Sequence, residues 1–123
     1  MTLKITREEV IHVQEKWANG VVTIGNKFAN GEDYVSYAEN FIDLAYGYSL
    51  GDVLFKPTFA AKKQFRLSKI AALSYFIGGN SNYDEDKGFA LNKWESIRFE
   101  NIGIQLNNNL AVAMGNYFFL KDN

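Results

Sequence analysis

The sequence contains no cysteine, a single proline and a single histidine among its 123 residues. Without cysteine the chain forms neither disulfides nor thiolate ligands, and this composition fits a reducing compartment, so we expect a cytoplasmic protein. One histidine, His12, is too few for a zinc site, which usually combines several His or Cys ligands. We therefore interpret His12 as an ordinary structural or surface residue and expect neither a metal nor a cofactor.

The sequence also lacks a strong charge of either sign and any long apolar run. Its 13 Lys and Arg and 14 Asp and Glu residues leave a formal net charge of -1, which gives nucleic acid no electrostatic reason to bind. No uncharged apolar segment approaches the roughly 18 residues of a membrane-spanning helix. The first ten residues, MTLKITREEV, are too charged for a secretory signal. We expect no nucleic-acid or membrane partner.

Apolar and aromatic side chains are abundant instead. Hydrophobic residues make up 47% of the chain and aromatic residues 15%, which is ample for the core of a globular protein. The length is close to the commonest domain size. We therefore expect one domain over residues 1–123, with helices over about 6–46 and strands over about 53–120.

Two helices are predicted in the N-terminal part of the chain. Thr6 and Glu9 have the spacing of a capping box, in which each side chain satisfies a backbone N–H at a helix start. An apolar stripe at steps of three and four follows. It consists of Val10, Val13, Trp17, Val21, Ile24 and Phe28. This helix is expected to end near residues 30–31 and to kink or break at residues 19–20, Asn-Gly, before a second helix over 33–46.

Beyond residue 51 the pattern indicates strands. Residues 53–55 are expected to form a short strand, 70–77 a buried one and 89–104 a long one. Asn107 to Asn109 is predicted to be a turn, because Asn tolerates positive φ, and 110–120 is expected to return antiparallel. Helices followed by a meander of strands predict an α+β fold, with both helices packed on a curved antiparallel sheet.

The segment 53–79 places polar residues between two apolar runs and contains Pro57, the only proline. These polar residues are Thr58, Gln64, Arg66, Ser74 and Tyr75. Buried polar groups need partners, so the cluster is either a structural network or a site. If residues 64–66 are extended, Gln64 and Arg66 project from the same face. The alternative for Arg66 is a salt bridge with Glu95 or Asp52.

Several short motifs in this region carry a resemblance to a known family. They are VLFKPT at 53–58, QFR at 64–66, ALSYF at 72–76, DEDKGFA at 84–90, the strand around Trp94, and AMGNYFF at 113–119. In order and spacing they resemble the iota-class carbonic anhydrases. The resemblance implies the cone-shaped, cystatin-like fold shared with nuclear transport factor 2-like proteins and the kinase II association domain. That family continues with two further strands and a His-His-Ser-Ser motif, which this sequence lacks, so we expect a sheet short of its last strands.

The resemblance also implies a metal-independent hydration of carbon dioxide to bicarbonate in an apolar pocket. Thr58 and Tyr75 match the family's hydroxyl residues, whose implied role is to hold and polarise the attacking water; the family's third hydroxyl has no match here. A tyrosine with its ordinary pKa near 10 is a poor base, and Arg66 is expected to stabilise bicarbonate or to lower that pKa. The residues expected to bind substrate are Gln64, Arg66, Ser74, Asn116 and Tyr117.

Other readings of the same residues stay open. Thr58 could cap a turn after Pro57, and Tyr75 could be a core residue with a satisfied hydroxyl. The chain would then be a non-enzymatic module of the same fold that binds a small apolar ligand or drives oligomerisation. A proton transfer of the ketosteroid-isomerase type is disfavoured, because no acidic residue lies within 53–77.

Two further features bear on partners and metals. The strand over 110–120 is apolar on both faces, and an exposed edge of that kind invites pairing, so we expect a homo-oligomer, with a dimer favoured. The acidic run Asp84-Glu85-Asp86 lacks the glycine and the spacing of a calcium loop. We therefore expect this run to be a solvated loop.

Overall fold

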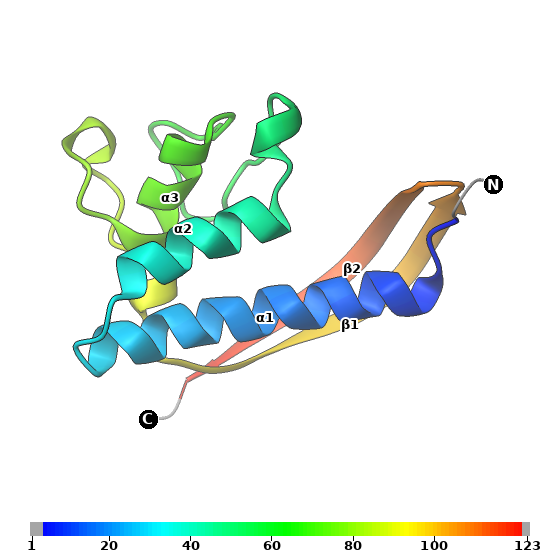
Figure 1. Cartoon of the computed structure of the whole chain (residues 1–123), viewed down its shortest axis with the longest axis horizontal. Coiled ribbons are helices and arrows are strands. Elements are labelled where there is room, and N and C mark those ends of the chain that lie inside the picture. Colours follow the sequence, from blue (N-terminus) through cyan, green and yellow to red (C-terminus); the bar gives the residue numbers. More distant parts are fainter. Residues whose placement is uncertain (1–3, 122–123) are drawn as a thin grey trace.

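The computed structural model describes residues 4–121. Figure 1 shows a long helix, α1, with a two-stranded hairpin crossing behind it and the shorter helices and their loops above it. In chain order the elements are α1 (Arg7–Ala29), α2 (Tyr34–Ala45), the short 3-10 turn η1 (Tyr48–Leu50), α3 (Lys69–Ile77), the 3-10 turns η2 (Ser81–Tyr83) and η3 (Phe89–Leu91), β1 (Trp94–Asn107) and β2 (Leu110–Lys121). The predicted α+β class is confirmed.

The start of α1 is the predicted capping box. The Thr6 hydroxyl accepts a hydrogen bond from the Glu9 amide, and the Glu9 carboxylate accepts one from the Thr6 amide, both at 3.2 Å. The Asn19-Gly20 pair, at which a kink or break was possible, does not break the helix, because α1 runs continuously through it. Gly20 has a packing reason instead, since a β-carbon there would collide with the ring of Phe41 on α2.

The core lies where α1, α2 and α3 meet. Its fully or nearly fully buried members are Val21, Ile24, Ala38, Phe41, Ile42, Ala72, Tyr75, Phe76 and Ala90. The small residues among them allow the helices to approach closely, while Phe41 and Phe76 meet edge to face with ring centroids 5.7 Å apart. Within residues 4–121, no helix combines the length and the apolar character that crossing a membrane requires.

The hairpin of β1 and β2 matches the predicted turn and return strand. The strands pair antiparallel, and Asn108 adopts the positive φ of 55° that the turn needs. A bulge between Asn101 and Gly103 shifts the register. The backbone amide of Ile5 donates to the carbonyl of Asn108 at 2.7 Å, so the start of the described chain is fastened to the hairpin tip.

Three of the predicted strands are wrong in type or extent. Residues 70–77 form helix α3, because the Ser68 hydroxyl accepts from the Ala71 amide as a cap and Gly78 ends the helix at φ 67°. Residues 53–55 form no strand, although the Phe55 carbonyl accepts from the Arg66 amide at 2.8 Å. The long strand starts at residue 94 rather than 89, since residues 89–91 are a 3-10 turn.

Candidate functional site

The candidate site lies against a wall of aromatic rings that every large element helps to build. Trp17 of α1 is at its centre, with ring centroids 5.9 Å from Phe99, 6.0 Å from Tyr117 and 6.1 Å from Phe119 of the hairpin. On the α3 side, the rings of Tyr75 and Phe89 stack at 5.5 Å. Such a wall is apolar and stiff, which suits a pocket for a small apolar molecule.

Three hydroxyl groups lie at this wall: two are in contact with each other, and the third is joined to them through the backbone of Phe59. The Oγ1 atom of Thr58 lies 3.4 Å from the Oη atom of Tyr117, and the Phe59 amide donates to the Oη atom of Tyr75 at 3.3 Å. The usual range is about 2.7–3.2 Å for an N–H···O bond and about 2.5–3.0 Å for an O–H···O bond. The contact between the Thr58 and Tyr117 hydroxyls is therefore long, and both retain capacity to bond a third molecule. The structure thus brings together the two predicted catalytic residues and one predicted pocket residue, Tyr117.

The loop before α3 delivers Thr58 to this position. Pro57 is buried, and its carbonyl accepts from the Ala60 amide at 3.3 Å to close a tight turn. The Thr58 side chain does not supply the bond that closes this turn; its hydroxyl contacts Tyr117 of β2 instead. The alternative in which Thr58 serves as the cap of the turn is therefore not the arrangement found.

Burial keeps the tyrosine hydroxyls protonated. Tyr75 is 6% exposed, and desolvation raises its pKa above the ordinary value of 10, opposed only in part by the Phe59 amide and the cation of Arg66. Desolvation also raises the pKa of Tyr48 to about 12. Arg66 does lower the pKa of Tyr75, as expected, but desolvation outweighs this effect and the net pKa lies above the ordinary value. Tyr75 can donate or accept hydrogen bonds at neutral pH, but it is not a base.

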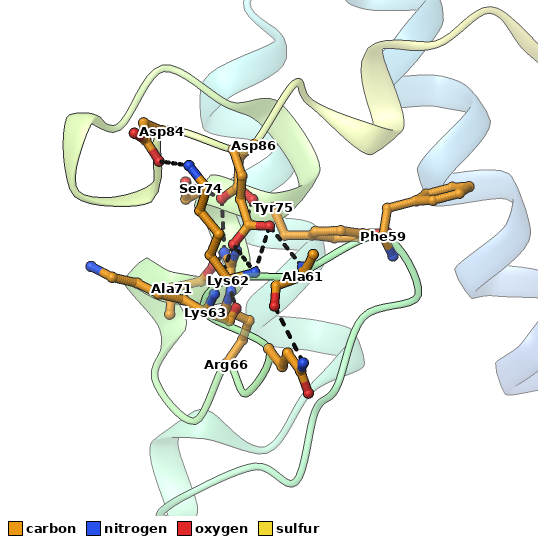
Figure 2. Close-up of polar contacts among 12 residues, drawn as sticks. Phe59, Ala61, Lys62, Lys63, Arg66, Ala71, Ser74, Tyr75, Asp84 and Asp86 are labelled. Atoms are coloured by element: carbon orange, nitrogen blue, oxygen red, sulfur yellow. Dashed lines mark hydrogen bonds and ion pairs between the residues drawn. The ribbon is translucent and has the colours of Figure 1, made fainter.

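Arg66 does not face the hydroxyl groups as a free cation. Its side chain is fully buried, and its Nη1 and Nη2 atoms donate to the two oxygens of Asp86 at 2.7 and 2.8 Å (Figure 2). The Ser74 hydroxyl donates to the same carboxylate at 2.6 Å. The expected salt-bridge partners, Asp52 and Glu95, are wrong: Arg66 pairs with Asp86 and, at 3.8 Å, with Glu85.

The remaining predicted residues lie apart from the hydroxyl cluster. Gln64 is exposed and donates to the Ala61 carbonyl at 3.2 Å, so it does not share a buried face with Arg66. Asn116 is exposed and donates at 3.3 Å to Glu100, its partner across the hairpin. Neither side chain contacts the hydroxyl groups through a hydrogen bond found among residues 4–121.

Sequence reasoning missed the role of the acidic run. Only Asp84 is solvated as expected, with 75% of its side chain exposed, whereas the Glu85 and Asp86 side chains are 12% and 1% exposed. The prediction of a solvated loop is therefore wrong for these two residues. A buried cation requires a carboxylate partner, and that rule applied to Arg66 would have pointed to the nearest acidic run.

Other polar groups in the described chain do not form a second site. His12 is exposed on α1. Among residues 4–121, no three His, Cys, Asp or Glu side chains gather in a way that could hold a metal ion. A groove of about 460 Å³ lies between α1 and α2, lined in part by Val13, Trp17, Phe41 and Leu44. Its lining shares Trp17 with the aromatic wall but includes none of the three hydroxyl residues.

A family model and a curated relative match the same family over most of this chain. A family model described as metal-independent carbonic anhydrase matches residues 8–123. A curated relative of that name from Nostoc sp. (strain PCC 7120) is 42% identical over 115 residues, which cover 91% of this chain and 56% of the relative. The chain therefore spans a little over half the length of this relative.

A solved structure gives the same result for the fold. It is the crystal structure of an iota-carbonic anhydrase from a cyanobacterium, complexed with bicarbonate. The match has a TM-score of 0.94 and 37% sequence identity, and it covers 98% of this chain and 76% of that chain. At this identity and coverage, the likeness extends to sequence as well as to backbone.

Proposed function

The chain belongs to the metal-independent carbonic anhydrase family, as its motifs predicted, and we propose that it hydrates carbon dioxide to bicarbonate without a metal ion. The observation that carries this proposal is the convergence of Thr58, Tyr75 and Tyr117 hydroxyls on an aromatic wall. The bicarbonate bound by the solved relative supports the class of ligand.

The reaction needs a positioned water and stabilisation of charge that develops on carbon dioxide. The water oxygen forms a bond to carbon, one C=O π pair moves onto its oxygen, and one water proton leaves to solvent, which gives bicarbonate. The hydroxyls of Thr58 and Tyr117 orient the water, and Tyr75, whose oxygen already accepts the Phe59 amide, directs its own proton at the developing negative charge. Because burial raises the pKa of Tyr75 and it keeps its own proton, solvent or buffer takes the released proton.

The aromatic wall supplies the other requirement. Carbon dioxide is apolar, so rings such as Trp17 and Phe119 favour it over water on one side of the site. At Tyr75, which is 6% exposed, the exclusion of bulk water also strengthens the hydrogen bond that the hydroxyl makes to developing charge. The site thus places hydroxyl groups that can bind water beside an aromatic surface that can bind carbon dioxide.

Stopped-flow hydration of carbon dioxide, run with and without a chelator, tests the proposal. We expect catalysis that a chelator leaves unchanged and that Thr58→Val reduces. Thr23→Val is the matched control, because the Thr23 hydroxyl is exposed on α1 and bonds only to the Asn19 carbonyl of its own helix. Loss of the rate on chelation would contradict the metal-free mechanism, and absence of catalysis in both conditions would contradict hydration by this chain.

The proposed oligomer rests on the outward face of β2. Alternate residues of this strand present an apolar row to solvent. The row consists of Leu110, Val112, Met114, Phe118 and Leu120, each between 37% and 69% exposed. Within residues 4–121, β2 pairs only with β1, so one of its edges is also free to pair. A homodimer formed through β2 would cover both the apolar row and the unpaired edge of the strand.

Sedimentation velocity tests the dimer. At tens of micromolar, a working range for weak self-association, we expect a dimer that Met114→Lys converts to monomer. Ala113→Lys is the matched control for an added charge on the same strand, because Ala113 is exposed on the opposite face from the apolar row. A parent chain that sediments as a monomer at these concentrations would rule the dimer out.

A further inference from the structure

The loop that carries Thr58 has no regular secondary structure to hold it. Residues 52–68, here called the Thr58 loop, form no helix or strand. Its ends are joined by the hydrogen bond from the Arg66 amide to the Phe55 carbonyl at 2.8 Å. Between these ends the position of Thr58 depends on contacts with other segments, and the strongest of these contacts come from Glu85 and Asp86.

Glu85 binds the loop backbone directly. One carboxylate oxygen accepts from the Ala61 amide at 2.7 Å, the other accepts from the Lys63 amide at 2.8 Å, and the Lys62 amide donates to both at 3.1 Å. Three consecutive amides therefore converge on one carboxylate, two to four residues after Phe59. These bonds, Lys63 first, lower the pKa of Glu85 to about 2, so the carboxylate is charged at neutral pH.

Asp86 ties the other end of the same loop to helix α3. It forms the paired bonds to Arg66 and accepts the Ser74 hydroxyl, and Ser74 directly precedes Tyr75 on α3. Arg66 extends the tie through its Nε atom to the Lys63 carbonyl and its Nη1 atom to the Ala71 carbonyl, both at 2.8 Å. Figure 2 shows these groups converging between the loop and the helix.

We propose that Glu85 and Asp86 are positioning residues for the hydration reaction: together they hold the Thr58 loop against α3, so that the Thr58 and Tyr75 hydroxyls meet the same reactants. This inference rests on the proposed function. Two contacts fix the position of the loop relative to the other hydroxyls: the Thr58 hydroxyl to the Tyr117 hydroxyl, and the Phe59 amide to the Tyr75 hydroxyl. A displacement of about 1 Å in such a site can reduce a rate roughly a hundredfold.

The chemistry of the cluster favours positioning over stability alone. A buried ion pair often adds little net stability relative to apolar packing of the same volume. What Arg66 and Asp86 add is direction, because two parallel bonds between a planar guanidinium and a carboxylate fix both distance and orientation. Glu85 likewise specifies the path of three successive peptide groups, which an apolar side chain could not do.

Glu85→Gln tests the proposal, because the amide keeps the size of the side chain but replaces one acceptor oxygen with a donor. We expect kcat for hydration to fall at least about tenfold with KM changed less, since the wall that binds carbon dioxide is untouched. Glu85→Asp, which keeps the charge, is expected to recover part of the loss. Asp84→Asn is the matched control in the same acidic run. Its kcat is expected to stay within about twofold of the parent, because Asp84 is 75% exposed and pairs with the exposed ammonium of Lys62 at 3.6 Å rather than with a loop amide.

Amide hydrogen exchange measured by NMR gives a readout that does not require activity. In Glu85→Gln we expect faster exchange at Ala61, Lys62 and Lys63 and also at Phe59, whose amide bonds to Tyr75. Asp84→Asn is expected to leave all four unchanged. A protected Phe59 amide in Glu85→Gln would overturn the proposal, as would an unchanged kcat or a loss that only tracks the unfolded fraction. If the parent chain itself shows no hydration, the proposed function fails, and Phe59 exchange alone decides whether Glu85 positions the loop.

Discussion

The hydroxyl oxygens of Thr58 and Tyr117 lie 3.4 Å apart, although 59 residues separate them in the chain. One comes from a loop without regular structure and the other from a strand of the hairpin. Their approach joins the two halves of the candidate site, because the loop also places the Phe59 amide on Tyr75 of α3. Three segments distant in sequence, the Thr58 loop, α3 and β2, therefore contribute to one small region.

A double-mutant cycle on this pair tests whether the two hydroxyls act together. We expect Thr58→Val and Tyr117→Phe each to reduce kcat for hydration by about tenfold to a hundredfold, the range for loss of one positioned donor. The double variant is expected to lose little more than the worse single variant, because either change already frees the water that both hydroxyls orient. Multiplicative losses in stopped-flow assays would instead indicate two independent roles.

Tyr75→Phe separates the chemical role of the buried hydroxyl from its structural role. Removing it leaves the Phe59 amide without its acceptor, so we expect the free energy of unfolding to fall by about 1 kcal/mol. The hydration rate is expected to fall further, by about tenfold to a hundredfold, because the ring stays in place while the donor to developing charge is lost.

Urea unfolding and stopped-flow kinetics on the same preparation measure the two effects of Tyr75→Phe. Tyr34→Phe provides the control, since that ring packs on Phe28 at 5.0 Å, away from the hydroxyl cluster. A Tyr75→Phe variant with the parent rate would remove Tyr75 from the mechanism and leave it as a core residue.

The parts of the fold that could be predicted are those with long or redundant signals. The stripe and capping box of α1 repeat over many turns, and the hairpin has an Asn-rich turn between two extended runs. The apolar run at 70–77 is only eight residues long, and such a run fits a buried strand and a buried helix equally well. The flanking residues determine that this run is a helix, because Ser68 caps the start of α3 and Gly78 ends it.

In the candidate site, too, some features could be predicted from the sequence and others could not. The hydroxyl residues Thr58 and Tyr75 stand in motifs that can be compared with other sequences. The partner of Arg66 could not be found by periodicity, because Asp86 is 20 residues further on and only the packing of the loop against α3 brings them together. The rule that a buried charge needs a partner of opposite charge would have narrowed the possible partners of Arg66 to the acidic residues.

Gly20→Ala tests how tightly α1 and α2 are packed. A β-carbon at this position would meet the ring of Phe41, which is itself buried against Phe76. Alanine is the better helix former by about 1 kcal/mol, so on an open helix it would stabilise. Here we expect a net loss of about 1–3 kcal/mol from overpacking, seen as a lower urea midpoint. Asn19→Ala next to it is exposed and serves as the control; a more stable Gly20→Ala would show that Phe41 can move away freely.

The low pKa of Glu85 makes the stability of the fold depend on acid. Its ordinary pKa is 4.5 and its pKa in the folded chain is about 2, because three backbone amides, Lys63 first, stabilise the charged form. The unfolded chain therefore binds a proton first as pH falls. The contribution of Glu85 to stability is complete above about pH 4.5 and declines as pH falls toward 2.

Urea unfolding at several pH values checks this dependence. The parent is expected to be more stable than Glu85→Gln at pH 7. The difference in stability should narrow between pH 4.5 and 2, as the Glu85 carboxylate takes up a proton and becomes uncharged like the glutamine. The stability of Asp84→Asn should depend on pH in the same way as that of the parent, because the three amides bind Glu85 and not Asp84. A gap that stays constant across this range would mean that the charge on Glu85 does not hold the Thr58 loop, and that the three amide contacts contribute through shape alone.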